Sequence, residues 1–306
     1  MKVIFLGTPE FAVKPLRAVI AAGHEVVAVV TNPDRKSGRK QEITAPPVKR
    51  EALASGLKVL QYERVSREGI EELERLKPDI MITCAFGQIL SERLLGIPKY
   101  GVINVHASLL PKYRGAAPIQ WAVANGERET GVTIMNTVKA LDAGEIILQE
   151  KIPVGRETAD EMFDKLSALA CPLLVRALEL IQSGKAEYKR QDEAAATRCA
   201  MLTKEAGLID WSKGAGSLDC FIRGMNGWPV AYTFLKGTPL KIWRAEPAEG
   251  NGREGEVICA DVKTGLLVAC GEGALKIEEL QLSGSKRMGW KEFVAGRKIT
   301  EGDVLR

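Results

Sequence analysis

The residues best suited to chemistry lie in one stretch, 101–120, and in a short motif downstream of it. Asn104 and His106 are two residues apart in an apolar run that predicts a strand, so their side chains share one face of it. They lie near the carboxyl end of that strand, the edge at which open α/β sheets bind ligands. Asp142, in the turn Leu-Asp-Ala-Gly between two further predicted strands, is expected to meet the pair there.

An Asn, a His and an Asp suit acyl transfer by direct attack of an amine on a carbonyl carbon. The Asn104 amide can donate a hydrogen bond to the oxyanion that forms. An imidazole with the ordinary pKa of about 6.5 exchanges protons near neutral pH, which suits His106, and Asp142 can hold that imidazole or relay protons through water. The alternatives are a hydrogen-bonded strand histidine, a simple turn aspartate, and Ser108 as a nucleophile, although Ser108 lacks the G-x-S-x-G setting.

Two other kinds of site are disfavoured. The first βα turn has Gly7 but no further glycine until Gly23, so the G-x-G-x-x-G pattern of dinucleotide-binding proteins is missing. The six cysteines include no CxxC pair and the chain has two histidines, so we expect no metal.

The elements that must position these residues follow from hydrophobic periodicity. Apolar runs predict strands at 2–6, 26–30, 57–60, 79–84, 101–106, 132–138 and 145–152. Helices are predicted at 12–20, 48–55, 66–76, 118–124 and 158–183; Thr8 would cap the first, and Thr158 with Glu161 forms a capping box for the last. Strands separated by helices indicate a largely parallel sheet covered on both faces.

The pattern changes after Gly184. Residues 190–207 are polar and rich in small side chains, which is typical of a linker. From 208 onward, glycines separate short strands at 240–244, 254–259, 266–270 and 275–281, with one helix at 217–225. We therefore expect three parts: a catalytic α/β domain at 1–189, a linker at 190–207, and a small β-barrel domain at 208–306.

Basic charge is concentrated near the N-terminus. The chain has 306 residues and a net charge of +4, and the segment 31–50 alone holds six basic residues against two acidic ones. Its turn-forming residues predict a loop. Such a loop can contact the phosphates of a nucleic acid, the alternative being an ordinary solvated surface loop.

The sequence resembles the methionyl-tRNA formyltransferases, a family of enzymes that depend on 10-formyltetrahydrofolate. The matching pieces are FLGTPEFAV at the start, TNPDR and SGR in the basic segment, AFGQIL at 85–90, NVHASLLPKYRGAAPIQWAVANGE at 104–127 and TVKALDAGEI at 137–146. Weaker agreement follows at Ile209-Asp210-Trp211 and in RGMNGWP at 223–229, so the resemblance spans nearly the whole chain.

The resemblance implies a Rossmann-like formyltransferase domain followed by an OB-like barrel that binds tRNA. The donor would be 10-formyltetrahydrofolate as co-substrate, and the acceptor the free amino group of initiator methionyl-tRNA, attacking directly without a covalent enzyme intermediate. The residues carried over are Asn104, His106 and Asp142 for catalysis; Ser108, Leu109, Leu110, Pro111, Phe86, Gly87, Gln88 and Ile89 for folate; and Arg35, Lys36, Arg39 and Lys40 for tRNA.

Other interpretations stay open at this point. A related enzyme could formylate an amino-sugar nucleotide or hydrolyse formyltetrahydrofolate, and a non-catalytic tRNA-binding protein is an alternative of another class. The basic segment and the appended β domain favour tRNA formylation over the first two, and the intact Asn104, His106 and Asp142 set disfavours the last. The start of the chain does not resemble a signal peptide and no apolar run approaches the length of a membrane span, so we expect a cytoplasmic monomer with no membrane partner.

Overall fold

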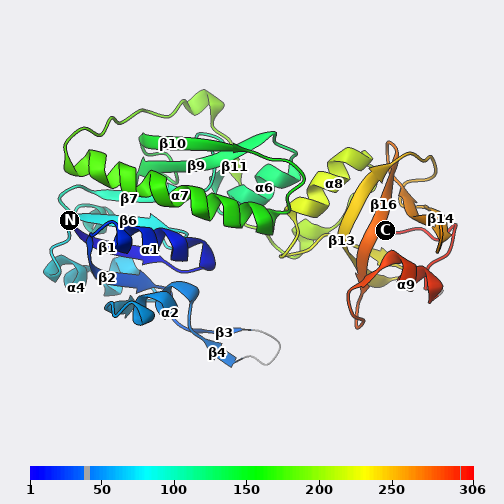
Figure 1. The fold of residues 1–306 in the computed structure, drawn as a ribbon, viewed down its shortest axis with the longest axis horizontal. Helices are drawn as coiled ribbons and strands as arrows, with labels where there is room; N and C mark the ends of the chain where they lie inside the picture. Colours follow the sequence, from blue (N-terminus) through cyan, green and yellow to red (C-terminus); the bar gives the residue numbers. More distant parts are fainter. Residues whose placement is uncertain (38–41, 297) are drawn as a thin grey trace. The chain divides into compact units, whose positions relative to one another are not determined.

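The structure is a computed structural model that describes residues 1–37, 42–296 and 298–306 (Figure 1). Arg39 and Lys40, two of the residues expected to bind tRNA, lie outside the described residues. The chain divides into two compact units. The first comprises Met1–Pro118, Glu129–Ile152 and Phe163–Cys199, and the second comprises Ile119–Arg128, Pro153–Met162 and Ala200–Arg306. The domain boundaries predicted from the sequence stay a prediction.

A seven-stranded sheet forms the centre of the first unit, in the order β10-β9-β7-β6-β1-β2-β5. Its strands are β1 (Lys2–Gly7), β2 (Glu25–Thr31), β5 (Val59–Gln61), β6 (Ile80–Cys84), β7 (Val102–His106), β9 (Glu129–Asn136) and β10 (Ile146–Pro153). Strands β5, β2, β1, β6 and β7 pair in parallel, and β9 runs antiparallel to β7. The carboxyl ends of five neighbouring strands therefore meet at one edge.

The strands are central because their residues are apolar on both faces. All five residues of β6 are buried, as are the last five of β1, and this continuous burial is typical of a parallel sheet covered by helices. The helices up to residue 195 are η1 (Glu10–Ala12), α1 (Val13–Ala21), α2 (Pro47–Ala54), α3 (Val65–Glu68), α4 (Ile70–Arg75), α5 (Glu92–Leu95), α6 (Pro118–Ala124), α7 (Ala159–Gln182) and η2 (Glu193–Ala195).

The long helix α7 lies against the beginning of the chain. Phe163 packs edge-on against Phe11 with 5.1 Å between ring centroids, and the buried Ser167 hydroxyl donates to the Phe11 carbonyl at 2.8 Å. Figure 1 shows α1 and α7 along the same face of the sheet. The predicted capping box is confirmed at the start of α7, because the Thr158 amide donates to the Glu161 carboxylate and the Glu161 amide donates to the Thr158 hydroxyl.

Three local predictions are wrong. Thr8 does not cap a helix, since η1 begins after Pro9 without a side-chain cap and the Thr8 hydroxyl accepts from the Asn32 amide instead. The predicted helix at 66–76 is two short helices, α3 and α4, separated at Gly69. Part of the predicted basic loop is a hairpin, in which β3 (Arg35–Ser37) pairs antiparallel with β4 (Glu42–Thr44) and projects from the rest of its unit (Figure 1).

The second unit is built on an antiparallel sheet in the order β12-β13-β16-β15-β14, with β17 beside β16. Its elements are η3 (Glu205–Gly207), α8 (Ala215–Gly224), β12 (Tyr232–Leu235), β13 (Thr238–Ala248), β14 (Val257–Asp261), β15 (Gly265–Ala269), β16 (Ala274–Leu282), β17 (Met288–Gly289) and α9 (Trp290–Ala295). The predicted fold class, a mostly parallel α/β domain followed by a small β domain, is confirmed. Within the described residues, none of the helices combines the length and hydropathy that a bilayer crossing requires.

The second unit contains a buried thiol, and we expect it to make the free energy of unfolding depend on pH in the alkaline range. Cys270 is buried directly after β15, and burial raises the pKa of its thiol to about 11. A thiol whose pKa is raised by folding contributes stability that is present below its unfolded pKa of about 8.5 and is lost as pH rises toward the folded value. Between about pH 8.5 and pH 11, we expect the free energy of unfolding to fall less steeply in Cys270→Ala than in the wild type.

Urea unfolding at pH 7.5 and pH 10 measures this difference, with Cys259→Ala, a half-buried thiol on β14, as the matched control. Equal pH dependence in Cys270→Ala and the wild type would contradict the assignment.

Candidate active site

The predicted catalytic residues converge at the carboxyl edge of the sheet. Asn104 and His106 lie on β7, two residues apart, and the loop after β9 brings Asp142 to them. The Asn104 Nδ2 atom is 3.5 Å from Asp142 Oδ1, and His106 Nδ1 is 3.7 Å from Asp142 Oδ2. The side chains of His106 and Asp142 are only 6% and 12% exposed, so their interaction is weakly screened by solvent.

The Asp142 carboxylate is held by backbone as well as by side chains. The Gly115 amide donates to Asp142 Oδ2 at 2.9 Å. Asp142 itself has a φ of +48°, a left-handed conformation that Asp adopts more readily than most residues. Sparsely populated backbone conformations of this kind cluster at functional sites, where contacts from the surrounding structure hold them.

The hydrogen bond on the far side of His106 defines its tautomer. His106 Nε2 is 2.9 Å from the Tyr113 carbonyl oxygen, which can only accept, so Nε2 carries the proton. In the neutral ring, Nδ1 is then the unprotonated nitrogen, and it faces the Asp142 carboxylate. A proton arriving at Nδ1 forms an imidazolium that this carboxylate stabilises.

Thr83 orients the Asn104 amide. It lies beside Asn104 in the parallel register of β6 and β7, and its hydroxyl donates to Asn104 Oδ1 at 2.9 Å. The Asn104 NH₂ group is therefore the part of the amide that remains to donate toward a ligand. Sequence reasoning missed this positioning residue, although a threonine within the apolar strand Ile-Met-Ile-Thr-Cys is a detectable signal.

The residues predicted to bind folate fall into two segments. The segment 108–111 follows β7 directly; the buried Ser108 hydroxyl donates to the Lys112 carbonyl at 2.7 Å, and the Leu110 amide donates to the Thr133 hydroxyl. Leu109 and Pro111 are half-buried, whereas Leu110 is buried. Because its hydroxyl is buried and already bonded, Ser108 is poorly placed to act as a nucleophile.

The second segment, 86–89, follows β6. The Gln88 amide nitrogen donates to Asn32 Oδ1 and to the Tyr62 carbonyl, while its oxygen accepts from the Val65 amide. Phe86 is buried and Ile89 is 85% exposed. Gln88 thus joins the loops after β2, β5 and β6, and Ile89 and Gly87 face solvent.

Of the residues predicted to bind tRNA, the structure describes Arg35 and Lys36, both exposed on β3. Arg35 forms an ion pair with Glu63 at 2.6 Å. At the base of the hairpin, the Lys49 ammonium donates to Asp34, and together with Gln61 it holds the pKa of the Asp34 carboxyl below its usual range. Part of the basic charge in 31–50 is therefore paired within the protein.

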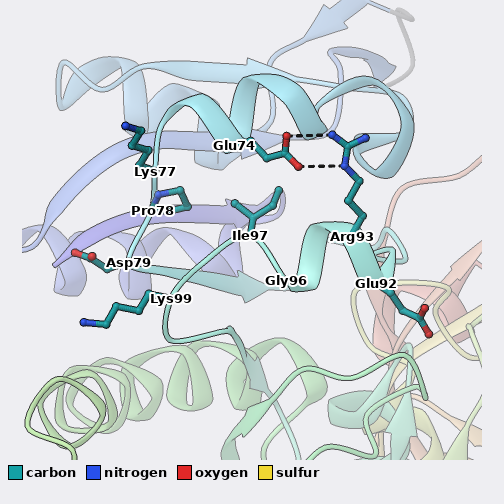
Figure 2. A pocket seen from close by; sticks show the side chains of 9 residues that line it. All are labelled: Glu74, Lys77, Pro78, Asp79, Glu92, Arg93, Gly96, Ile97 and Lys99. Atoms are coloured by element: carbon teal, nitrogen blue, oxygen red, sulfur yellow. Dashed lines mark hydrogen bonds and ion pairs between the residues drawn. The ribbon is translucent and has the colours of Figure 1, made fainter.

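One hollow lies away from these residues. Its volume is about 610 Å³, and its walls come from α4, α5 and the segments that precede β6 and β7, including Asp79 and Lys99. Figure 2 shows Glu74 and Arg93 facing each other across a two-bonded ion pair on one wall. A smaller hollow of about 340 Å³ lies beside the Asp142 loop and is lined by residues that include Ala143, Gly144 and Gln191. Of these two hollows, only the second adjoins the loop that carries Asp142.

Within the described residues, no three or more His, Cys, Asp or Glu side chains lie together so that they could hold a metal ion. What the three side chains can do together is donate to an oxyanion, accept a proton and stabilise the resulting positive charge. This set of roles matches acyl transfer.

The contact between Gly115 and Asp142 generates a testable prediction. Gly115 has a φ of +126°, and a Cβ there would overlap the Cys199 carbonyl oxygen. Gly115→Ala should therefore displace the amide that donates to Asp142, lowering the free energy of unfolding by about 1–3 kcal/mol and turnover by about 10-fold or more.

Thermal melts and steady-state kinetics check both effects, with Gly96→Ala as control because Gly96 has an ordinary φ of −84° and a Cβ there would make only ordinary van der Waals contacts. Wild-type turnover in Gly115→Ala would show that this amide is not needed to hold Asp142.

Comparisons with known proteins agree over both units. The family model described as formyl transferase matches residues 1–178, and the model for the formyl transferase C-terminal domain matches residues 201–298. The methionyl-tRNA formyltransferase of Citrifermentans bemidjiense is 47% identical, covering 100% of this chain and 96% of the relative. That of Geobacter sulfurreducens is 45% identical, again covering 100% of this chain and 96% of the relative.

Solved structures show the same fold at lower identity. An N-formyltransferase from Helicobacter canadensis, in complex with folinic acid and dTDP-3-aminofucose, has a TM-score of 0.68 at 19% identity and covers 94% of this chain and 100% of that one. HypX from Aquifex aeolicus, in complex with tetrahydrofolic acid, has a TM-score of 0.64 at 17% identity, with 100% of this chain and 51% of that one covered. With relatives at 45–47% identity along its whole length, the chain belongs to the formyl transferase family, among the methionyl-tRNA formyltransferases.

Proposed function

We propose that this protein transfers the formyl group of 10-formyltetrahydrofolate to the α-amino group of initiator methionyl-tRNA. The observation that carries the proposal is the convergence of Asn104, His106 and Asp142 at the carboxyl end of β7. Membership of the methionyl-tRNA formyltransferases supports the choice of acceptor. As an enzyme of translation it would act in the cytoplasm, and we expect a monomer.

The transfer begins when the methionyl amine attacks the formyl carbon. A new C–N bond forms, and the formyl oxygen becomes an oxyanion that the Asn104 NH₂ group can stabilise by donating a hydrogen bond. The attacking nitrogen gains positive charge and loses a proton to His106 Nδ1, where the Asp142 carboxylate stabilises the imidazolium. The bond to N10 of the folate then breaks, and N10 takes up that proton. The products are formylmethionyl-tRNA and tetrahydrofolate.

Direct attack is favoured over a covalent enzyme intermediate. The serine that the sequence offers as a nucleophile is Ser108, whose hydroxyl is buried and donates to the Lys112 carbonyl. The donor itself carries an activated acyl group, so the chemistry needs proton transfer and oxyanion stabilisation rather than a new nucleophile.

Both co-substrates would bind to segments near the carboxyl edge of the sheet. We propose that folate lies along 108–111 and 86–89, the two segments that directly follow the neighbouring strands β7 and β6. The exposed cations of β3, together with Arg39 and Lys40, which follow β3 in the sequence, would contact the phosphates of the tRNA acceptor end.

Comparing acceptors side by side tests the proposed function. Purified protein and 10-formyltetrahydrofolate are combined with methionyl initiator tRNA, methionyl elongator tRNA, a 4-amino-sugar nucleotide, or no acceptor. Formylation of the initiator tRNA alone is expected. Transfer to the sugar, or formate release without an acceptor, would contradict the proposed acceptor, and tRNA binding without any turnover would contradict catalysis.

The two histidines of the chain provide a matched pair of variants. His106→Ala should lower kcat at least about 100-fold, the scale of a lost acid–base group, while the dissociation constants for folate and tRNA stay close to those of the wild type. His24→Ala removes a half-buried histidine that lies next to the Met1 amine, and it should retain wild-type kcat. Near-wild-type kcat in His106→Ala would rule out its proposed role.

Charge removal in the basic segment tests the tRNA contact. The double variant Arg39→Gln/Lys40→Gln should raise KM for tRNA several-fold and lessen the salt dependence of tRNA affinity by about 1–2 in the slope of log K against log salt. Folate binding should not change. The control, Lys77→Gln/Lys99→Gln, removes the same charge beside the hollow at the opposite edge of the sheet (Figure 2) and should leave the slope unchanged. An identical slope in both double variants would reject the basic segment as a tRNA site.

A further inference from the structure

Gln191 lies beneath the Asp142 loop and bonds to it at two points. Its Nε2 atom donates to the carbonyl oxygens of Asp142, at 2.8 Å, and Gly144, at 2.7 Å. A primary amide has two N–H groups, so each carbonyl receives one of them. The side chain therefore clamps the turn on both sides of Ala143, directly behind the catalytic carboxylate.

The amide oxygen of Gln191 is held equally firmly. It accepts from Arg114 Nε at 3.0 Å and from Arg114 Nη2 at 2.8 Å. The Arg114 guanidinium is nearly buried, with 6% of its side chain exposed, and its charge is balanced by an ion pair with Glu193. The hydrogen bonds from Arg114 hold the pKa of the Glu193 carboxyl below its usual range, so this carboxylate keeps its charge.

Two backbone contacts hold the segment around Gln191 close to the Asp142 loop. Ile146 and Lys189 exchange a pair of backbone hydrogen bonds of 2.8 Å, which places Gln191 two residues beyond a fixed point on β10. Further on, β11 (Arg198–Cys199) pairs in parallel with β8 (Arg114–Gly115), so the segment is anchored on both sides of Gln191. The same β8 includes the Gly115 amide that donates to Asp142.

Asp142 is held at two points, its carboxylate by the Gly115 amide and its main chain by Gln191, and Arg114 links the two. Arg114 is the immediate neighbour of Gly115, which binds the carboxylate, and it also orients Gln191, which binds the main chain of the same residue. The φ of Asp142, +48°, lies in the left-handed region, which Asp tolerates but which is less favourable than the right-handed one for an L-residue, so contacts to its main chain help to hold the turn.

We propose that Gln191 is a positioning residue for formyl transfer, which holds Asp142 at the distance from His106 and Asn104 that the reaction requires. This inference rests on the proposed role of Asp142. Gln191 touches no reacting atom in this account and acts through Asp142 alone. A glutamine suits the position because one group must accept from a cation and donate to two carbonyls at once.

A double-mutant cycle tests the proposal. Gln191→Met keeps the length of the side chain but removes every hydrogen bond, and Gln191→Glu keeps the acceptor for Arg114 but removes both donors. Each should lower kcat by about 10- to 100-fold, the scale of a misplaced catalytic group, with little change in KM for either substrate. In an Asp142→Asn background, Gln191→Met should lower kcat by less than about 2-fold, because the residue through which it acts is already disabled.

A control separates positioning from simple destabilisation. Ser167→Ala removes one buried hydrogen bond in the same unit, on α7, and should lower the melting temperature while kcat is retained. Wild-type kcat in Gln191→Met or in Gln191→Glu would overturn the inference. An equal loss of kcat from Gln191→Met in the wild-type and Asp142→Asn backgrounds would also overturn it. Retained kcat in Asp142→Asn itself would instead refute the proposed role of Asp142.

Discussion

The candidate site depends on the position of one carboxylate, that of Asp142, which contacts from several other segments hold in place. Asp142 lies in a loop, in a left-handed backbone conformation, yet its two oxygens must meet His106, Asn104 and the Gly115 amide together. The other two candidate catalytic residues, Asn104 and His106, need no such arrangement because β7, inside the sheet, carries both of them. The parallel sheet thus positions the amide and the imidazole, and the surrounding loops position the carboxylate beside them.

The contacts that hold Asp142 come from residues that are distant from it in sequence. The backbone of β8 reaches the carboxylate from one side, and the segment after α7 reaches the main chain of Asp142 from the other. The segment 190–199, which the sequence assigns to a linker, belongs to the first compact unit. The network also has a consequence for the Cys199 thiol next to it. Burial raises the pKa of this thiol, so Cys199 packs as a neutral group beside an anionic site.

Much of the fold can be predicted because local periodicity and burial agree. The strand that carries Asn104 and His106, and the capping box at Thr158, follow from patterns a few residues long. Predictions were wrong where a short-range signal had a competing partner, as at Thr8, whose hydroxyl accepts from Asn32 rather than capping η1. Gln191 could not be predicted, since its bonds to Asp142 span 49 residues and leave no periodic trace. Thr83 lies between these cases, because its polarity in an apolar strand is visible but its partner is not.

In the proposed reaction, Asn104, His106 and Asp142 assist a direct passage of the formyl group from folate to the methionyl amine. Direct passage can be tested by a rapid-quench single-turnover experiment with donor labelled in the formyl group and enzyme in excess over initiator methionyl-tRNA. Labelled formylmethionyl-tRNA should then form at the rate at which the donor loses its label, with no label on the protein at any time. Label on the protein that appears before the product and then disappears into it would show a covalent intermediate and rule out direct passage.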